Sequence, residues 1–156
     1  MPHLTALVHT HNDALRLGRC LETLYPCDEL VIVDHGSSDA TLHIAREYGA
    51  KILIARAGHS PHFPISTGAW LLCLQARESI SEALAASLYE WKSAERNGAN
   101  AFSMLVREEV TGGWLENRDA ETRLVLSNWQ RWNGFLPTRD ASASALEGEI
   151  LRFAFP

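Results

Sequence analysis

Three short apolar runs, separated by segments with helical spacing, constrain the fold of this chain more than any other feature. The runs cover residues 4–9, 30–34 and 51–54, and each is too short for a helix of ordinary length. The second run, LVIVD, is continuous and rich in β-branched residues, which is typical of a central parallel strand covered on both faces. The order strand, helix, strand, helix, strand predicts a parallel sheet with right-handed crossovers.

Cap and breaker residues suggest where the two intervening helices begin and end. Asn12 is placed to cap the first helix, which carries leucines at helical spacing and is closed by Pro26. Residues 37–39 offer caps to a second helix that runs through Tyr48. Gly49 then stands where a left-handed residue is expected after a helix.

A fourth strand and a third helix follow a loop at residues 55–68, which contains two prolines and two glycines. The strand is expected at residues 70–74. Ser79 and Glu82 form the capping-box pattern S-x-x-E for a helix that should end near residues 97–98. The apolar face of this helix carries Ile80, Leu84, Leu88 and Trp91.

The second half of the chain is less regular. Residues 101–106 and 122–126 resemble strands, with a turn at residues 112–113 between them. Residues 140–145 are small and polar, as in a loose connection, and residues 149–155 suit a last edge strand. Three tryptophans in this half are more typical of a core than of a sugar-binding platform.

Composition excludes few classes of protein but narrows the choice. The 156 residues are enough for one domain, and the 46% hydrophobic and 21% charged shares are those of a soluble globular protein. A net charge of -5 argues against nucleic acid as a partner. Three cysteines without C-x-x-C spacing favour a reducing compartment, and no leader pattern or apolar run of about twenty residues is evident, so we expect a cytoplasmic protein without a transmembrane segment.

Polar motifs follow three of the predicted strands. They are HTHND at residues 9–13, DHGSSD at residues 34–39 and QAR at residues 75–77. The carboxyl ends of parallel strands meet at one edge of a sheet, where ligands bind in open α/β folds. Turn and cap chemistry alone would explain every residue of the second motif, so the pattern by itself is not specific.

Taken together, these motifs resemble the family 2 glycosyltransferases of the GT-A type, and most of all the branch that builds lipopolysaccharide cores. That family usually shows P-T-Y-N-E after its first strand and V-D-x-G-S-x-D-x-T after its second. The resemblance is strong over residues 4–53, weaker over residues 70–91, and echoed at residues 123–124, an R-L pair typical of that branch.

The resemblance implies a fold and a division of the chain. We expect a single GT-A-like α/β domain over residues 1–156, with a mostly parallel sheet flanked by helices and a mixed C-terminal part. Residues 1–98 would form the nucleotide-binding half and residues 99–156 the acceptor-side half.

The resemblance also implies roles for individual residues. His11 stands where the family has an aromatic residue stacked on uracil, and Asp34 where an aspartate contacts the base. Arg56 is the one positive charge left where the family has a helix with an Arg-Asn or Lys-Asn pair. The complete set of implied nucleotide-binding residues is Thr10, His11, Asn12, Asp34, Arg56, Gln75 and Arg77. Asp119 and Glu121 are candidates for the general base, although solvated turn carboxylates would look the same.

The chain departs from the family after the fourth strand. The branch has L-D-A-D-E there, whose aspartates hold a divalent metal, Mg or Mn, on the donor diphosphate. Here residues 74–78 read L-Q-A-R-E, so a metal is expected for the family but its ligands are missing. Arg77 could replace the metal, the domain could bind a donor without turning it over, or the site could be vestigial.

Three functions therefore stay open. The first is transfer of a sugar from a nucleotide-sugar donor, UDP-linked by family habit, to a glycan or lipid-linked acceptor. The second is a non-catalytic module that binds nucleotide or a protein partner. The third is a metal-binding α/β protein that uses a rim of histidines, His9, His11, His35, His59 and His62. A homo-oligomer is compatible with each.

Overall fold

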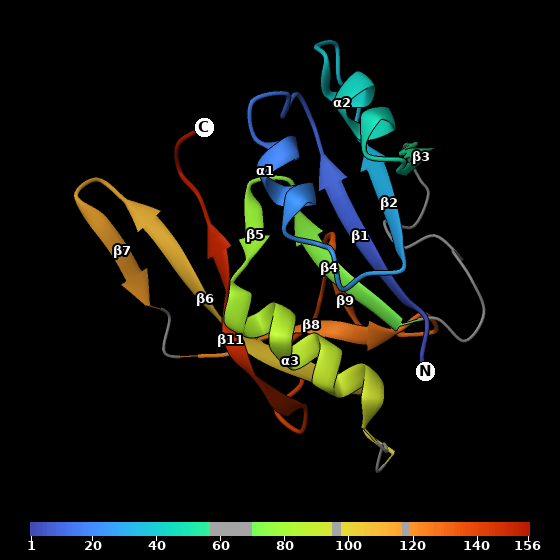
Figure 1. Ribbon diagram of the computed structural model, residues 1–156, viewed down its shortest axis with the longest axis vertical. Coiled ribbons are helices and arrows are strands. Elements are labelled where there is room, and N and C mark those ends of the chain that lie inside the picture. Colours follow the sequence, from blue (N-terminus) through green and yellow to red (C-terminus); the bar gives the residue numbers. More distant parts are fainter. Residues whose placement is uncertain (57–69, 95–97, 117–118) are drawn as a thin grey trace.

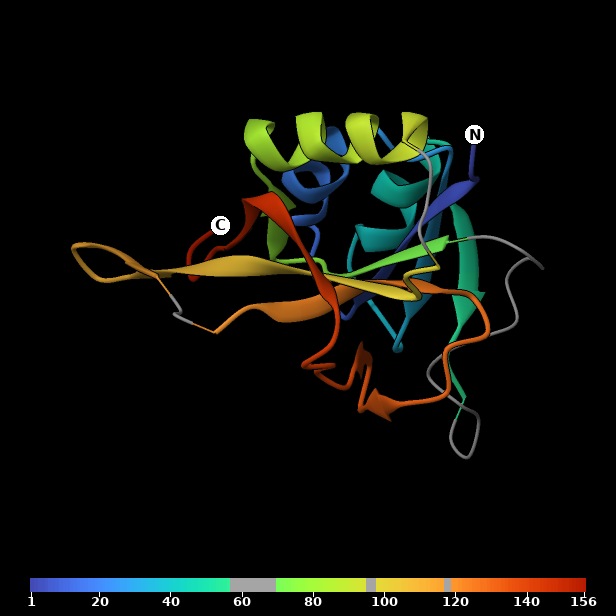
Figure 2. The same cartoon turned by 90° about the horizontal axis from the view of Figure 1, so that it is seen from below.

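The computed structural model describes residues 1–56, 70–94, 98–116 and 119–156. Within these residues, nine strands form one mixed sheet, and two further strands form a separate hairpin (Figure 1). Figure 2 shows the helices gathered on one face of the sheet and the small hairpin on the other. The chain is therefore an α/β fold of the expected class.

The first half forms a parallel sheet in the order β3-β2-β1-β4. Its strands and helices are β1 (Leu4–Thr10), α1 (Leu17–Glu22), β2 (Glu29–Asp34), α2 (Thr41–Glu47), β3 (Lys51–Ile54) and β4 (Trp70–Gln75). In the register, Thr10 lies opposite Asp34 and His9 lies opposite Gln75. The prediction of a parallel sheet is confirmed, and its register brings the three polar motifs to one edge.

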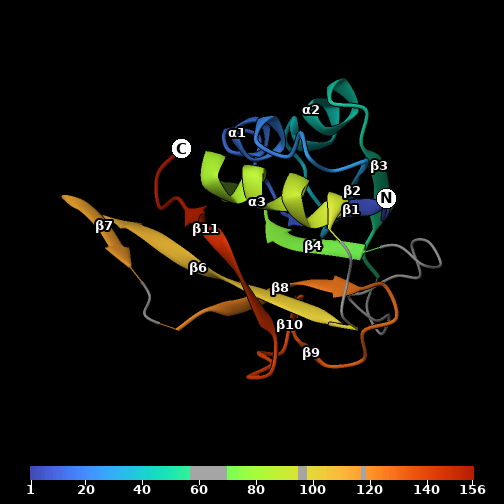
Figure 3. The same ribbon diagram turned by 60° about the horizontal axis from the view of Figure 1, so that its bottom comes forward.

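The second half continues the sheet through β8, which is antiparallel to β4 (Figure 3). The order then runs through β6 and β11 to β5, with β7 forming a hairpin on β6. These elements are β5 (Glu78–Ile80), α3 (Glu82–Ser93), β6 (Ala101–Val110), β7 (Gly113–Glu116), β8 (Glu121–Leu126), β9 (Trp132–Asn133), β10 (Leu136–Pro137) and β11 (Ser144–Arg152). Strands β9 and β10 make the separate hairpin.

Successive side chains of a strand point to opposite faces of the sheet, and the central strands contribute to a buried apolar cluster on each face. On β1, Ala6 and Val8 join the larger core cluster with the helix residues, whereas Leu7 joins a smaller cluster with Val31 and Trp129. All seven residues of β1 are buried, as expected for a central strand with both faces covered.

The start of the first helix differs from the prediction. Asn12 does not cap it: α1 begins at Leu17, and Asn12 adopts a left-handed φ of 51°. Its side-chain Oδ1 accepts a hydrogen bond from the Ser38 N–H at 2.8 Å instead, which ties the loop after β1 to the loop after β2. Gly49 does adopt a left-handed conformation after α2, with φ 73°.

The predicted capping box at residues 79–82 is wrong. The chain turns after β4 and forms β5, which pairs antiparallel with β11, so Ser79 lies in a strand. The cap of α3 is Ser81, whose Oγ accepts a hydrogen bond from the Leu84 N–H at 3.1 Å. The helix ends at Ser93, before residues 97–98.

The last strand is not an edge strand. β11 lies between β6, to which it is parallel, and β5, to which it is antiparallel. The prediction failed because β5 is an additional strand that covers this side of β11. Most of the predicted loop at residues 55–68 lies outside the described residues.

No helix among the described residues is long and apolar enough to cross a membrane.

Candidate functional site

A cavity of about 330 Å³ lies at the carboxyl ends of β1, β2 and β4. Its lining residues come from the three polar motifs and from the β9–β10 hairpin: His9, Thr10, His11, Asp13, His35, Gln75, Ala76, Arg77 and Phe135. This is the edge at which the sequence motifs were expected to meet. Four of the predicted nucleotide-binding residues line the cavity, namely Thr10, His11, Gln75 and Arg77.

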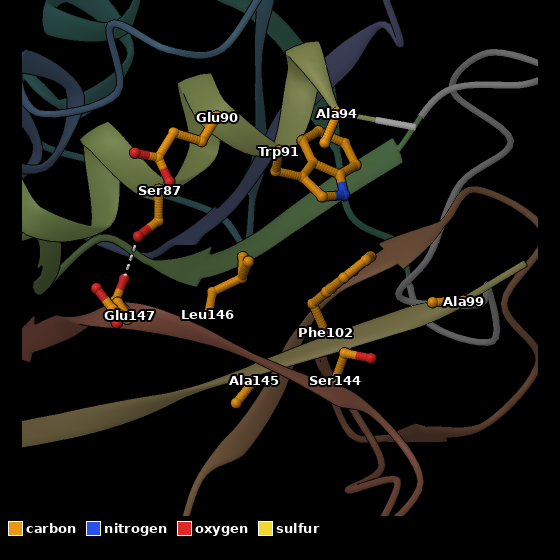
Figure 4. Close-up of a pocket in the computed structure, with 10 residues that line it drawn as sticks. All are labelled: Ser87, Glu90, Trp91, Ala94, Ala99, Phe102, Ser144, Ala145, Leu146 and Glu147. Atoms are coloured by element: carbon orange, nitrogen blue, oxygen red, sulfur yellow. Dashed lines mark hydrogen bonds between the residues drawn. The ribbon is translucent and has the colours of Figure 1, made fainter. Parts of the chain in front are cut away.

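A second cavity, of about 400 Å³, lies between α3 and the strands β6 and β11 (Figure 4). Trp91, Phe102 and Leu146 supply its apolar lining, and the Ser87 hydroxyl donates to the Glu147 carbonyl across it at 2.7 Å. None of the predicted site residues lines this cavity. The first cavity is therefore the candidate functional site.

The loop after β1 is held by its own acidic residue. Asp13 accepts hydrogen bonds from the Thr10 hydroxyl at 2.8 Å and from the His11 N–H at 3.0 Å. Its other carboxylate oxygen pairs with Arg16 at 3.4 Å. The imidazole of His11 is exposed, and its Nδ1 donates to the His35 carbonyl at 2.9 Å. This bond fixes the His11 ring at the rim of the cavity.

The carboxylate of Asp34 accepts hydrogen bonds from the turn that follows it. Its Oδ2 accepts from the N–H groups of Gly36 and Ser37 at 3.2 and 3.1 Å, and its Oδ1 accepts from the Ser37 hydroxyl at 2.5 Å. Asp34 is buried. This carboxylate shapes the loop, and a direct contact with a base remains a prediction.

The turn between β4 and β5 presents a guanidinium to the cavity. The Arg77 Nε donates to the Gln75 Oε1 at 3.1 Å, and the Gln75 N–H donates to Glu78 at 2.8 Å. Among the described residues, no carboxylate lies within ion-pair distance of Arg77. Arg77 lies in the turn between β4 and β5, and its terminal nitrogens are available to an anion.

Glu78, which directly follows Arg77 at the start of β5, is fully buried in a network of ion pairs. Its two oxygens meet Arg123 at 2.8 and 2.9 Å, and one of them also meets Arg152 at 3.0 Å. Burial raises the pKa of Glu78, but the hydrogen bonds and charge of Arg123 outweigh that effect and hold the pKa below its ordinary value. Glu78 is thus an anchor for the β4–β5 turn.

The two candidates for a general base do not line the cavity. One oxygen of Glu121 pairs with Arg123 at 3.0 Å and the other with Arg152 at 3.3 Å, so Glu121 belongs to the same network. Asp119 is exposed. Arg56 is also exposed, just after β3, and borders residues outside the described ranges.

The residues at the end of β4 do not fit the divalent metal that the family uses. Gln75 offers one amide oxygen, which Arg77 already engages, and the oxygens of Glu78 are bound by arginines. In the described part of the chain, no group of three or more His, Cys, Asp or Glu side chains could hold a metal ion. His59 and His62 of the predicted histidine rim lie outside that part.

Sequence reasoning missed the aromatic wall of the cavity. Phe135, from the β9–β10 hairpin, stacks on His9 and His35 with ring centroids 4.7 and 4.4 Å apart. Burial, and then the charge of His35, lowers the pKa of His9 from 6.5 to about 3, so its ring is neutral at pH 7. The sequence signal was weak, because Phe135 stands in a short turn far from the three motifs.

Comparison with known proteins places these features in a family context. No family model matches the chain. It is 33% identical over 121 residues to a TPR repeat-containing protein of Synechococcus elongatus, covering 72% of this chain and 29% of that protein. It is 42% identical over 45 residues to the lipopolysaccharide core biosynthesis glycosyltransferase LpsC of Rhizobium meliloti, covering 29% of this chain and 17% of LpsC. An uncharacterized glycosyltransferase of Rickettsia typhi is 28% identical over 90 residues, covering 54% of this chain and 31% of that protein. The chain thus spans less than a third of the length of these relatives.

Solved structures show the fold. Glucosyl-3-phosphoglycerate synthase of Mycobacterium tuberculosis, in complex with Mg²⁺ and UDP, superposes with a TM-score of 0.53 at 15% identity, over 67% of this chain and 44% of that one. Mannosyl-3-phosphoglycerate synthase of Rubrobacter xylanophilus gives a TM-score of 0.53 at 17% identity, over 69% of this chain and 41% of that one. The fold and the edge cavity define a domain of the GT-A type. The sequence relatives include glycosyltransferases, so the chain is similar to glycosyltransferases in sequence and shares the GT-A fold.

Proposed function

We propose that the chain binds a nucleotide-sugar donor, most simply a UDP-sugar, in the cavity at the carboxyl ends of β1, β2 and β4. The observation that carries this proposal is the Arg77 guanidinium, which lines the cavity without a carboxylate partner among the described residues. It stands where the family places an acidic metal ligand. The UDP complex of a protein with the same fold supports the choice of nucleotide.

In this proposal Arg77 supplies the positive charge that a metal supplies elsewhere. Its Nε is held by Gln75, which orients the planar guanidinium and leaves its two terminal nitrogens for phosphate oxygens. A guanidinium can bind a phosphate group through two parallel hydrogen bonds, and its charge persists at any physiological pH. Donor binding would then not require a divalent cation.

Sugar transfer would need a further group. An acceptor hydroxyl on a glycan or lipid-linked glycan must lose its proton as it attacks the anomeric carbon and the nucleoside diphosphate leaves. Asp119 and Glu121 remain the proposed bases, with residues 1–98 as the nucleotide-binding half and residues 99–156 as the acceptor side. Both oxygens of Glu121 are held by arginines, and this arrangement favours the second candidate function.

That second candidate is a non-catalytic domain that binds the nucleotide or a protein partner. The replaced metal ligands and the engaged carboxylates support it. The histidine rim is a third candidate: His9, His11 and His35 line the cavity but do not form a metal-binding group by themselves, so this candidate depends on His59 and His62, outside the described residues. We place the protein in the cytoplasm, where the described thiols, which form no disulfide, are stable.

Calorimetric titration and thermal unfolding with UDP, UDP-glucose and UDP-N-acetylglucosamine test the proposal. We expect binding by the wild type and a loss of at least about tenfold in affinity for Arg77→Gln, because one charge-assisted contact to phosphate is removed. Arg46→Gln, at an exposed position near the end of α2, is the matched control and should bind as the wild type does.

The outcomes separate the three candidates. No response to any nucleotide would refute donor binding and favour a protein-interaction module. Binding without turnover in the presence of glycan acceptors would favour the non-catalytic nucleotide-binding domain. Stabilisation by Zn²⁺ or Ni²⁺ alone, abolished in the His9→Ala, His11→Ala variant, would favour the histidine site.

A further inference from the structure

Phe135 stands at the turn of the β9–β10 hairpin, directly after Gly134, which adopts a left-handed φ of 62°. The hairpin lies on the face of the sheet opposite the helices (Figure 2). Phe135 nevertheless lines the cavity together with residues from β1 and β4. The second half of the chain thus contributes an aromatic side chain to a site built by the first half.

The Phe135 ring is held from behind by two imidazoles. It is nearly parallel to the His9 ring, at an interplanar angle of 16°, and is tilted by 41° to the His35 ring. The imidazoles are joined to each other through His9 Nδ1 and His35 Nε2 at 2.8 Å. His9 is buried, whereas Phe135 keeps 44% of its surface exposed. Part of the phenylalanine ring is therefore covered and part remains open to a ligand.

The hairpin that carries Phe135 is firmly attached. Trp129 is buried in the smaller core cluster, and its indole N–H donates to the Arg131 carbonyl at 2.7 Å. The indole N–H of Trp132 donates to the Trp129 carbonyl at 2.8 Å, and the Thr138 N–H closes the base of the hairpin on Arg131 at 2.9 Å. Because these bonds hold the hairpin, Phe135 needs little reorganisation to receive a ligand.

The two sides of the cavity differ in chemistry. One side is the stack of uncharged aromatic rings, and another is the Arg77 guanidinium next to Gln75. An apolar ring surface attracts a flat or flat-faced ring, and a guanidinium attracts a phosphate. A ligand that uses both must carry a ring and a phosphate in one molecule.

We propose that Phe135, supported by His9 and His35, is a stacking platform for the ring of a phosphorylated ligand whose phosphate meets Arg77. This inference rests on the proposed function and adds a binding residue from the second half of the chain. The ring is either the base or the sugar of the donor. Both have a face that can lie against an aromatic side chain, and the experiment separates them.

The test compares three ligands by calorimetry: UDP, which carries a base, glucose 1-phosphate, which carries only a sugar ring, and pyrophosphate, which carries neither. The variant is Phe135→Leu, with Phe135→Tyr to restore an aromatic ring. Tyr89→Leu is the matched control, because Tyr89 is also about half exposed, at 49%, and stacks on another aromatic ring, Tyr25.

We expect Phe135→Leu to weaken binding of a ring-bearing ligand by about tenfold and to leave pyrophosphate binding unchanged, because stacking on one aromatic side chain is lost. A loss confined to UDP assigns the base to Phe135, and a loss confined to glucose 1-phosphate assigns the sugar. The tyrosine variant should recover most of the affinity. Thermal unfolding confirms that each variant is folded, and Phe135→Met replaces the leucine variant if that one does not fold.

Equal affinity of the wild type and Phe135→Leu for both ring-bearing ligands would overturn this inference and leave the proposed function standing. An equal loss for pyrophosphate would also overturn it, because it would indicate a general disturbance of the cavity. If the wild type bound none of the three ligands, the proposed function and this inference would fail together.

Discussion

Arg123 and Glu78 form a fully buried, two-pronged ion pair that joins β8 to β5, with nitrogen–oxygen distances of 2.8 and 2.9 Å. A further hydrogen bond from Arg123, at 3.0 Å, reaches the Cys73 carbonyl on β4. The pair therefore connects the strand before the Gln75–Arg77 turn with the strand after it. It provides the scaffold on which the cavity edge is built.

Glu78→Gln should destabilise the protein by about 3–5 kcal/mol, because it leaves buried arginine charge without its carboxylate. Chemical denaturation measures this change in the free energy of unfolding. Glu47→Ala, which removes an exposed ion pair with His43 on α2, is the control and should change stability little. Similar losses in the free energy of unfolding for both variants would show that the buried pair contributes no more to stability than the exposed pair.

Gly148 is predicted to be intolerant of any side chain. Its φ is 100°, and a Cβ at this position would lie 2.2 Å from the backbone nitrogen of Leu84 at the start of α3. Gly112 has a similar φ of 90° but nothing within 4 Å of a Cβ. Gly112→Ala should cost about 1–2 kcal/mol for the backbone conformation alone. Gly148→Ala should lower the free energy of unfolding by at least about 2 kcal/mol more than Gly112→Ala, because its Cβ would also clash with α3. Equal losses for the two variants in chemical denaturation would contradict the packing of α3 on β11.

His9 should make stability depend on pH below neutrality. Its pKa is about 3 in the folded chain and near 6.5 when unfolded, so only the unfolded chain gains a proton between these values. Stability from this group is complete above pH 6.5 and falls as the pH drops toward 3, by at most about 1.4 kcal/mol per pH unit. Burial also lowers the pKa of His35, so this residue too makes the protein less stable as the pH falls.

His9→Phe keeps a ring on Phe135 and removes the titrating group. Unfolding free energies measured between pH 6.5 and 5 should therefore depend less on pH in this variant than in the wild type. That window lies above the ordinary carboxyl pKa of 4.5, below which the Glu78 network also loses stability. The same slope in both proteins would show that His9 is not held neutral by burial.

Two aspartates introduced at positions 75 and 77 should make UDP binding depend on a metal. In the Gln75→Asp, Arg77→Asp variant, UDP binding should be weak in EDTA and strengthened about tenfold or more by Mn²⁺, since carboxylate oxygens suit hard divalent cations. The Gln75→Asn, Arg77→Asn variant is matched in size and lacks the charge, so Mn²⁺ should not rescue it. Calorimetry with both variants would contradict the account if neither or both responded to Mn²⁺.

The parallel half of the fold could be predicted because its signals are local. Strands β1, β2 and β3 are apolar runs flanked by helix and turn residues, and their polar ends needed only the rules of parallel sheets to be brought together. Strand β5 was missed because three residues beginning with Glu78 do not look like a buried strand. Its burial depends on Arg123 and Arg152, which stand 45 and 74 residues further along the chain.

The candidate site was predicted on one side only. His11, Gln75 and Arg77 follow strands whose order could be inferred, so their meeting at the cavity could be foreseen. The position of Phe135 could not be predicted, because its hairpin consists of two-residue strands. The hairpin is positioned by Trp129, which packs in the smaller core cluster. The self-contained turn of Asp34 is likewise visible only once its hydrogen bonds to Gly36 and Ser37 are known.

We propose above that Arg77 takes the place of a metal in donor binding. Calorimetric titration of UDP into the wild type, in Mn²⁺ and in EDTA, tests it most directly. We expect measurable binding with the same affinity in both buffers, and loss of that binding in Arg77→Gln but not in Arg46→Gln. Binding that requires Mn²⁺, or that survives unchanged in Arg77→Gln, would contradict it.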